Sequence, residues 1–204
     1  MIKLLGKIPN SVTLACSGGP DSMAALDFLI KGRKRVKVAH FDHGTEHGSD
    51  ARKFVHEFCI DKSIPITIGT NIEKRNAGES WEAFWRDQRY RFFNSIDGPI
   101  ITVHQLNDVG EWWLFTSSRG NPRLIPHRNG KIIRPFLMTP KSELESWCER
   151  FSVPCVTDPG NFDFKFARSR IRNNIMPEIL KVNPGFLTVM RKKILAEFKR
   201  KNEE

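Results

Sequence analysis

The stretch Cys16-Ser17-Gly18-Gly19-Pro20-Asp21-Ser22, CSGGPDS, separates two segments with different sequence patterns. Residues 12–15 before it have the composition of a buried strand, whereas residues 21–30 have a helical pattern of apolar side chains. Two glycines at such a junction let the backbone approach an anion closely, and the amide groups of the first helical turn point at it. The stretch therefore predicts a phosphate-binding loop between a strand and a helix.

The side chains of this loop indicate which anion it binds. Ser17 and Ser22 can donate hydroxyl hydrogen bonds to phosphate oxygens. Asp21 would repel a phosphate unless a cation lies between them, so we expect Mg²⁺ together with the phosphates. The loop is not of the Walker A type, because both Gly-Lys pairs of the chain are followed by Ile. The alternative is an ordinary glycine turn.

Strand-like and helix-like segments alternate along the first half of the chain. We expect buried strands at 12–15, 36–41, 64–68 and 100–103, with helices at 21–30, 49–60 and 80–95 between them. This alternation predicts an α/β fold, a doubly wound parallel sheet with flanking helices, whose ligand binds at the carboxyl ends of the strands. We expect one catalytic domain over 1–182 and a basic amphipathic C-terminal helix over 183–204, packed on the same domain.

Composition limits the class of protein. The chain has 204 residues, of which 39% are hydrophobic and 27% charged, as in a soluble globular domain. No apolar run approaches the roughly 18–20 residues of a membrane span, and the apolar part of the N-terminus is too short for a signal peptide. We therefore expect a cytoplasmic protein with no membrane partner. The four cysteines form no C-x-x-C pair and no zinc spacing, which indicates isolated thiols.

The charge balance suggests a polyanionic partner. Thirty-three Lys and Arg residues against twenty-three Asp and Glu residues give a net charge of +10. A solubilising surface is the alternative, and charge alone does not separate RNA from DNA. The last helix presents an apolar stripe and a basic face, for which core packing and RNA contact are the two interpretations.

Residues 17–22 resemble the S-G-G-x-D-S fingerprint of the N-type ATP pyrophosphatases, the PP-loop enzymes. Enzymes of that family bind the pyrophosphate part of ATP and transfer AMP to a carbonyl oxygen. The resemblance implies a Rossmann-like fold with ATP and Mg²⁺ as cofactors. The ATP-binding residues that it implies are Ser17, Gly18, Gly19, Pro20, Asp21, Ser22 and His40, the last from the stretch HFDHG at the end of the second strand.

Further motifs, from about residue 12 to residue 177, are similar to the N-terminal catalytic domain of the tRNA(Ile)-lysidine synthetases. They are HFDHG (40–44), ESWEAFWRDQRY (79–90), ITVHQLNDVGEWW (101–113), IRPF (133–136) and DPGNFDFKFARSRIRNNIMP (158–177). The resemblance implies adenylation of the C2 carbonyl of cytidine 34 in tRNA(Ile) CAU. Free lysine then attacks C2 and displaces AMP, which gives lysidine.

The same resemblance implies roles for particular side chains. The catalytic residues would be Asp21, Arg86, His104, Asp108 and Glu111. The Mg²⁺ ligands would be Asp21, Asp108 and Glu111, and the tRNA contacts Arg89, Arg119, Arg134, Arg168 and Arg172. The motifs also contain Tyr90 and the pair Asp158 and Asn161.

Each role has a structural alternative. Arg86 could form only a surface ion pair with Glu82, four residues before it. Asp108 and Glu111 could be solvated acids, and His104 could be a structural histidine. Trp112 and Trp113 are expected in the core or an interface. Arg168 and Arg172 could contact RNA phosphates or pair with nearby acids.

Several positions depart from the family pattern. Gln105 replaces a histidine, Asn107 an aspartate and Val109 a glutamine, while Glu46 stands where a basic residue is usual. These changes keep two rivals open: another PP-loop reaction such as tRNA thiolation, and a non-catalytic RNA-binding module. The wide cysteine spacing opposes thiolation, and the intact loop opposes the module.

Overall fold

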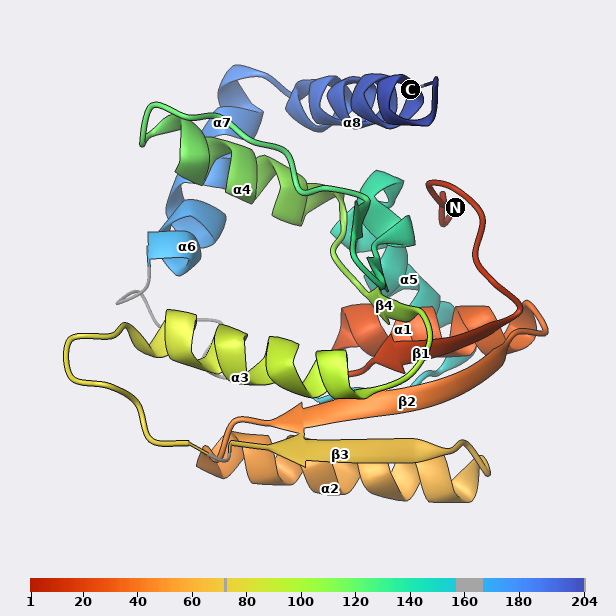
Figure 1. Ribbon diagram of the computed structural model, residues 1–204. Coiled ribbons are helices and arrows are strands. Elements are labelled where there is room, and N and C mark those ends of the chain that lie inside the picture. The colour runs from red at the N-terminus through yellow and green to blue at the C-terminus, as the bar shows by residue number, and fades with distance from the viewer. Residues whose placement is uncertain (72, 157–166, 204) are drawn as a thin grey trace.

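The computed structural model describes residues 1–71, 73–156 and 167–203 (Figure 1). Its centre is a six-stranded sheet of order β3-β2-β1-β4-β6-β5. The strands are β1 (Ser11–Ala15), β2 (Arg35–Asp42), β3 (Ile66–Thr70), β4 (Ile100–Thr102), β5 (Arg128–Asn129) and β6 (Ile132–Ile133). All neighbours pair in parallel except β5 and β6. The predicted doubly wound α/β fold is confirmed.

Eight α-helices and two short segments of other helix types accompany the strands within the described residues. The α-helices are α1 (Pro20–Lys31), α2 (Glu46–Asp61), α3 (Trp81–Ser95), α4 (Leu106–Ser117), α5 (Lys141–Phe151), α6 (Ala167–Arg170), α7 (Met176–Val182) and α8 (Phe186–Glu203). The shorter segments are a 3₁₀ helix at Pro135–Met138 and a π-helical turn at Ile171–Ile175. No helix in these ranges is both long and apolar enough to cross a bilayer.

The predicted elements lie within a few residues of the observed ones, with two differences. The antiparallel hairpin of β5 and β6 was not expected, because strands of two residues are too short to show a period. The sequence around Thr139 and Pro140 predicts an N-cap followed by a first-turn proline, but the helix begins one residue later, at Lys141. The Thr139 hydroxyl is used elsewhere, donating to the carbonyl oxygen of Lys3 at 2.7 Å.

The two faces of the sheet have separate cores. Leu14 of β1 and Met23 of α1 are fully buried in a cluster that also takes side chains from α2 and α5. On the other face, Phe93 of α3 packs with Ile100 and Ile132. The strand order shows that the chain winds outward in both directions from β1 and β4. This reversal brings the loops after β1, β2 and β4 to one edge.

The last helix packs on α4. Figure 1 shows α8 at the C-terminal end of the chain, and residue contacts join it to α4. Phe186 and Met190 of α8 are buried with Leu106 and Val109 of α4 in a third cluster. The rings of Trp113 and Phe186 lie 6.2 Å apart, so Trp113 is an interface side chain, as expected. The apolar stripe of α8 is therefore a packing surface, and its basic residues remain on the outside.

Candidate active site

The loop after β1 has a backbone that only glycine fits. Gly18 has φ +88°, a region that L side chains rarely adopt. A Cβ there would lie 3.0 Å from Val156 Cγ2 and 3.1 Å from Val55 Cγ2. The N–H of Val156 also donates to the Gly18 carbonyl at 2.9 Å. The loop is thus fixed from both sides by residues distant in sequence.

Hydroxyl groups inside the loop hold its shape. Ser22 Oγ donates to the Gly19 carbonyl at 3.0 Å and accepts from the Ser17 N–H at 3.2 Å. Ser17 Oγ lies 3.3 Å from the same hydroxyl. No side chain caps α1, which begins at Pro20 after Gly19, so its first amide groups are available to an anion.

His40 lies beneath the loop. Its Nδ1 lies 2.9 Å from the Cys16 carbonyl, an acceptor, so Nδ1 carries the proton. Burial lowers the pKa of His40, which keeps the ring neutral. Its Nε2 is buried without a hydrogen-bond partner. His40 therefore supports the loop and retains one free acceptor nitrogen at the predicted ATP site.

Asp21 is the loop's acidic group, and its environment favours a cation. Its Oδ1 is buried without a hydrogen-bond partner. Burial, and then the charge of Asp108, raise the pKa of Asp21 to about 7. A buried carboxylate beside a second carboxylate is stabilised by a positive ion, so Asp21 fits the predicted role of a Mg²⁺ ligand.

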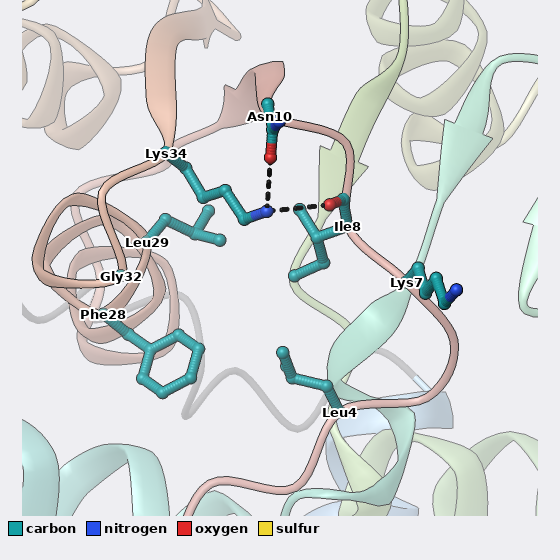
Figure 2. Close-up of a pocket in the computed structure, with 8 residues that line it drawn as sticks. All are labelled: Leu4, Lys7, Ile8, Asn10, Phe28, Leu29, Gly32 and Lys34. Carbon is teal, nitrogen blue, oxygen red and sulfur yellow. Dashed lines mark hydrogen bonds between the residues drawn. The ribbon is translucent and has the colours of Figure 1, made fainter.

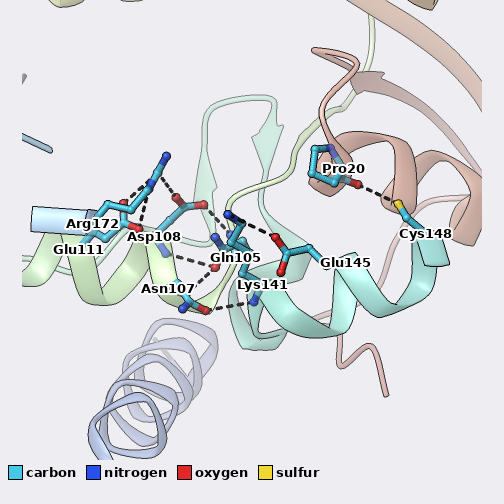
Figure 3. A network of polar contacts seen from close by, with 9 residues as sticks. All are labelled: Pro20, Gln105, Asn107, Asp108, Glu111, Lys141, Glu145, Cys148 and Arg172. Carbon is cyan, nitrogen blue, oxygen red and sulfur yellow. Dashed lines mark hydrogen bonds and ion pairs between the residues drawn. The ribbon is translucent and has the colours of Figure 1, made fainter. Parts of the chain in front are cut away.

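Asp108 and Glu111 are paired with an arginine (Figure 3). Arg172 donates to both oxygens of Glu111 at 2.9 Å and to Asp108 Oδ1 at 3.3 Å. Asp108 Oδ2 accepts from the N–H of Gln105 at 3.0 Å. Every oxygen of these two carboxylates therefore has a partner. Within the described residues, no group of three or more His, Cys, Asp or Glu side chains is arranged to hold a metal.

This arrangement bears on two expectations from the sequence. Asp108 and Glu111 bind Arg172 here, so the predicted ligation of Mg²⁺ by these acids would require Arg172 to move. Arg172 pairs with these acids, which was the alternative to contact with tRNA phosphates. The reason is burial: Glu111 is 2% exposed, and an unpaired carboxylate in that position would be costly.

Arginines with no acidic partner lie near His104. Arg89 is half-buried, and desolvation and then the like charges of Arg86 and Arg168 lower its pKa. Burial lowers the pKa of His104 to about 4, and the charges of nearby arginines act in the same direction. In the described part of the chain, Arg86, Arg89 and Arg168 form no ion pair, and we call these three side chains the arginine cluster. Such a cluster favours a polyanion.

The two remaining predicted tRNA contacts lie elsewhere. Arg134 is only 3% exposed and donates to the Pro126 carbonyl at 2.8 Å and to the Tyr90 hydroxyl at 3.1 Å. These bonds give Arg134 a structural role, whereas the resemblance to the synthetases implied a contact with tRNA. Arg119 is exposed and its guanidinium lies 4.2 Å from the Phe115 ring centre, beyond the C-terminal end of α4. It is therefore not part of the arginine cluster.

Three of the departures from the family pattern have structural roles. Gln105 Oε1 caps α4 by accepting from the N–H groups of Asn107 at 2.6 Å and Asp108 at 3.3 Å. Asn107 Oδ1 accepts from the N–H of Lys141 at 3.0 Å and joins α4 to α5. Val109 is fully buried in the core. Asp158 and Asn161 lie outside the described residues.

Sequence reasoning missed the residues that hold the loop from outside. Val55 comes from α2 and Val156 from the segment after α5, and neither is part of a motif. Cys148 of α5 also lies against the loop, with Sγ 3.4 Å from the Pro20 carbonyl. The helical spacing of α5 indicates its buried face, but no sequence signal shows that this face meets α1.

A separate pocket of about 410 Å³ lies at the opposite edge of the sheet (Figure 2). Phe28 and Leu29, from the C-terminal half of α1, form part of its lining. Lys34 donates to the Ile8 carbonyl and to Asn10 Oδ1, both at 3.0 Å. The residues that line it precede β1 and β2, so it is distinct from the loop site.

Comparisons with known proteins show which family the sequence matches. A family described as a PP-loop domain matches residues 3–179. A tRNA(Ile)-lysidine synthase of Thermosipho africanus is 32% identical over 87% of this chain and 45% of its own length. The enzyme of the same name from Geobacillus kaustophilus is 30% identical over 85% of this chain and 42% of its own length. The chain thus spans less than half the length of these relatives.

The fold also resembles a solved structure. A U34-tRNA thiolase of Methanococcus maripaludis, solved with its [4Fe-4S] cluster, superposes with a TM-score of 0.72. The match covers 93% of this chain and 72% of that chain, and the two sequences are 17% identical. This likeness concerns the fold alone, whereas the family match covers most of the sequence. The chain belongs to the PP-loop domain family.

Proposed function

We propose that this chain is a tRNA(Ile)-lysidine synthetase-like ligase. The C2 carbonyl oxygen of cytidine 34, in a tRNA(Ile) with the anticodon CAU, attacks the α-phosphorus of ATP and releases pyrophosphate. The ε-amine of free lysine then attacks C2, loses a proton and displaces AMP together with the former carbonyl oxygen. The products are lysidine, AMP and pyrophosphate.

One observation carries the proposal. The charge of Asp108 acts both on Asp21, in the loop with uncapped helix amides, and on His104, which lies within range of Arg89 and Arg168. Among the described residues, these two arginines form no ion pair with an acid. The loop suits a nucleotide polyphosphate with a cation, and membership of the PP-loop family supports ATP as that nucleotide. The arginine cluster suits a second polyanion, and the names of the relatives support tRNA.

Different residues of the chain have different roles in this reaction. The Ser17 hydroxyl and the first amides of α1, that of Ser22 among them, bind phosphate oxygens, while the Ser22 hydroxyl holds the loop in shape. Asp21 would hold Mg²⁺, which on binding would neutralise phosphate charge. Arg86 and Arg89 offset the negative charge that develops during transfer. His104, with Nδ1 3.1 Å from Thr102 Oγ1, is neutral and contributes a hydrogen bond without adding charge.

The cysteines favour lysidine formation over sulfur transfer. Cys16, Cys59 and Cys148 are buried, and burial raises the pKa of each thiol. Such thiols are poor nucleophiles and poor metal ligands because both roles need the thiolate. Cys155 is the exposed one, and a single accessible thiol does not supply the paired or catalytic cysteines that sulfur-transfer members commonly need.

The test measures incorporation of lysine into the RNA. The protein is incubated with ATP, Mg²⁺, radiolabelled lysine and a tRNA(Ile) CAU transcript, and label on the RNA is counted beside pyrophosphate release. We expect label on this transcript and none on a transcript with uridine at position 34. Asp21→Asn should abolish both signals while the exposed-acid control Asp61→Asn retains them. Pyrophosphate release without lysine incorporation would mean that the nucleophile is not lysine. Absence of pyrophosphate release would contradict the proposal that this chain is an enzyme.

A further inference from the structure

Lys141 is a cation beside the phosphate-binding loop that no motif includes. It is the first residue of α5, and its N–H donates to Asn107 Oδ1 at 3.0 Å. About two helical turns further along α5, Cys148 lies against the Pro20 carbonyl of α1 (Figure 3). Helix α5 is therefore fixed to α4 at its start and to the loop helix near its end.

The charge of Lys141 acts on the loop. Among the charges near Asp21, the ammonium of Lys141 is the leading one that lowers the pKa of this carboxyl, ahead of Arg172. The carboxylate of Glu145 acts in the opposite direction. The geometry agrees, because Figure 3 draws the side chains of Lys141 and Glu145 between the Asp108 network and Pro20, the first residue of α1. Both side chains therefore lie near the first turn of α1, where an anion would bind.

Lys141 is weakly held. Its Nζ lies 3.4 Å from Glu145 Oε1, one turn along the same helix, and the two side chains are 42% and 44% exposed. Exposed pairs of this kind contribute little to stability because water competes for both charges. Arg172, by contrast, is fixed by two buried carboxylates. Breaking the pair with Glu145 would therefore cost Lys141 little free energy if a more highly charged anion bound nearby.

We propose that Lys141 leaves Glu145 when ATP binds and donates to an oxygen of the β- or γ-phosphate. Lys141 is then the side chain that recognises the pyrophosphate part of the nucleotide. An ATP phosphate chain carries several negative charges, whereas Glu145 carries one, so the exchange is favourable. This inference rests on the proposed use of ATP and adds a residue to that site.

The same contact serves the first chemical step. When the bond from the α-phosphorus to the bridging oxygen breaks, negative charge collects on the departing pyrophosphate. An ammonium held against those oxygens offsets that charge without transferring a proton. Loss of Lys141 should therefore lower both nucleotide affinity and the rate of pyrophosphate release.

The experiment compares ligands with and without the outer phosphates. Binding of ATP, inorganic pyrophosphate and AMP, each with Mg²⁺, is measured by calorimetry for wild type, Lys141→Gln and Lys141→Arg. Lys181→Gln is the control, because Lys181 forms a similar exposed helical pair with Glu178 on α7. We expect Lys141→Gln to weaken ATP and pyrophosphate about 10-fold, the usual effect of a lost charged hydrogen bond, and to leave AMP unchanged. Lys141→Arg should recover part of the loss.

A further variant separates phosphate recognition from structural support. Glu145→Gln releases Lys141 from its partner, so ATP should bind as well as or better than in wild type. Equal losses for ATP and AMP in Lys141→Gln, or equal losses in Lys141→Gln and Glu145→Gln, would overturn the inference. Failure of the wild-type protein to bind ATP would instead count against the proposed function, so the two failures are distinguishable.

Discussion

Arg172 binds Glu111 through two parallel hydrogen bonds, from Nε and from Nη2, each 2.9 Å long. The Glu111 side chain is 3% exposed and that of Arg172 is 34% exposed. Burial raises the pKa of Glu111, and the hydrogen bonds from Arg172 act against this shift. The arginine therefore stabilises a charge that its surroundings alone would not tolerate.

Replacing this arginine should destabilise the fold. Arg172→Met leaves Glu111 and Asp108 without their cation, and breaking a buried pair costs about 3 kcal/mol. Arg170→Met is the matched control, because Arg170 is exposed in the same segment. Urea unfolding of the two variants measures the difference in free energy. A loss below about 0.5 kcal/mol for Arg172→Met, or equal losses in both variants, would show that the ion pair does not hold α4.

Gly18 provides a test of the loop geometry. Gly18→Ala meets two costs: a left-handed backbone, about 1–2 kcal/mol, and contact of the new Cβ with Val156 and Val55. Gly98→Ala meets only the first cost, because Gly98 has φ +81° and nothing lies within 4 Å of a Cβ there. We expect Gly18→Ala to lower the unfolding midpoint more than Gly98→Ala and to reduce ATP binding. Equal effects would mean that the loop tolerates the methyl group.

The sequence predicts the parts of this site that are local. The junction of strand, glycine pair and helix is contiguous, so residues 17–22 and α1 could be placed from their pattern alone. Arg172 and Glu111 are 61 residues apart, and nothing in either motif says that they pair with each other. Arg134 was expected to contact tRNA, but its burial depends on how the segment after β6 packs, which its motif does not show. Lys141 comes to the loop only through the contact of α5 with α1.

His104 should stay neutral through the physiological range. Burial lowers its pKa from 6.5 to about 4, so the unfolded chain binds a proton first as the pH falls. Stability that His104 contributes is therefore lost as the pH drops from about 6.5 to about 4. NMR titration of ¹³C-labelled histidine tests this, with the His104 signal assigned from its absence in His104→Gln. A midpoint near 6.5 for that signal would contradict the burial of the ring.

The basic outer face of α8 should make tRNA binding depend on salt. Lys192 and Lys193 are exposed, while the apolar stripe of the same helix is buried against α4. Each phosphate contact adds about 0.7–0.9 to the magnitude of the log–log salt slope, so reversing both charges should flatten the slope by up to twice that amount. The matched control reverses two other exposed lysines, Lys37 on β2 and Lys62 after α2. Its salt slope should stay steeper than that of the Lys192 and Lys193 variant. Discrimination for cytidine 34 should survive in both, because base identity would be recognised at the active site and phosphate contacts carry no sequence information. Binding of a tRNA(Ile) CAU transcript is measured at several salt concentrations, and identical slopes in the two double variants would make α8 a packing helix without an RNA contact.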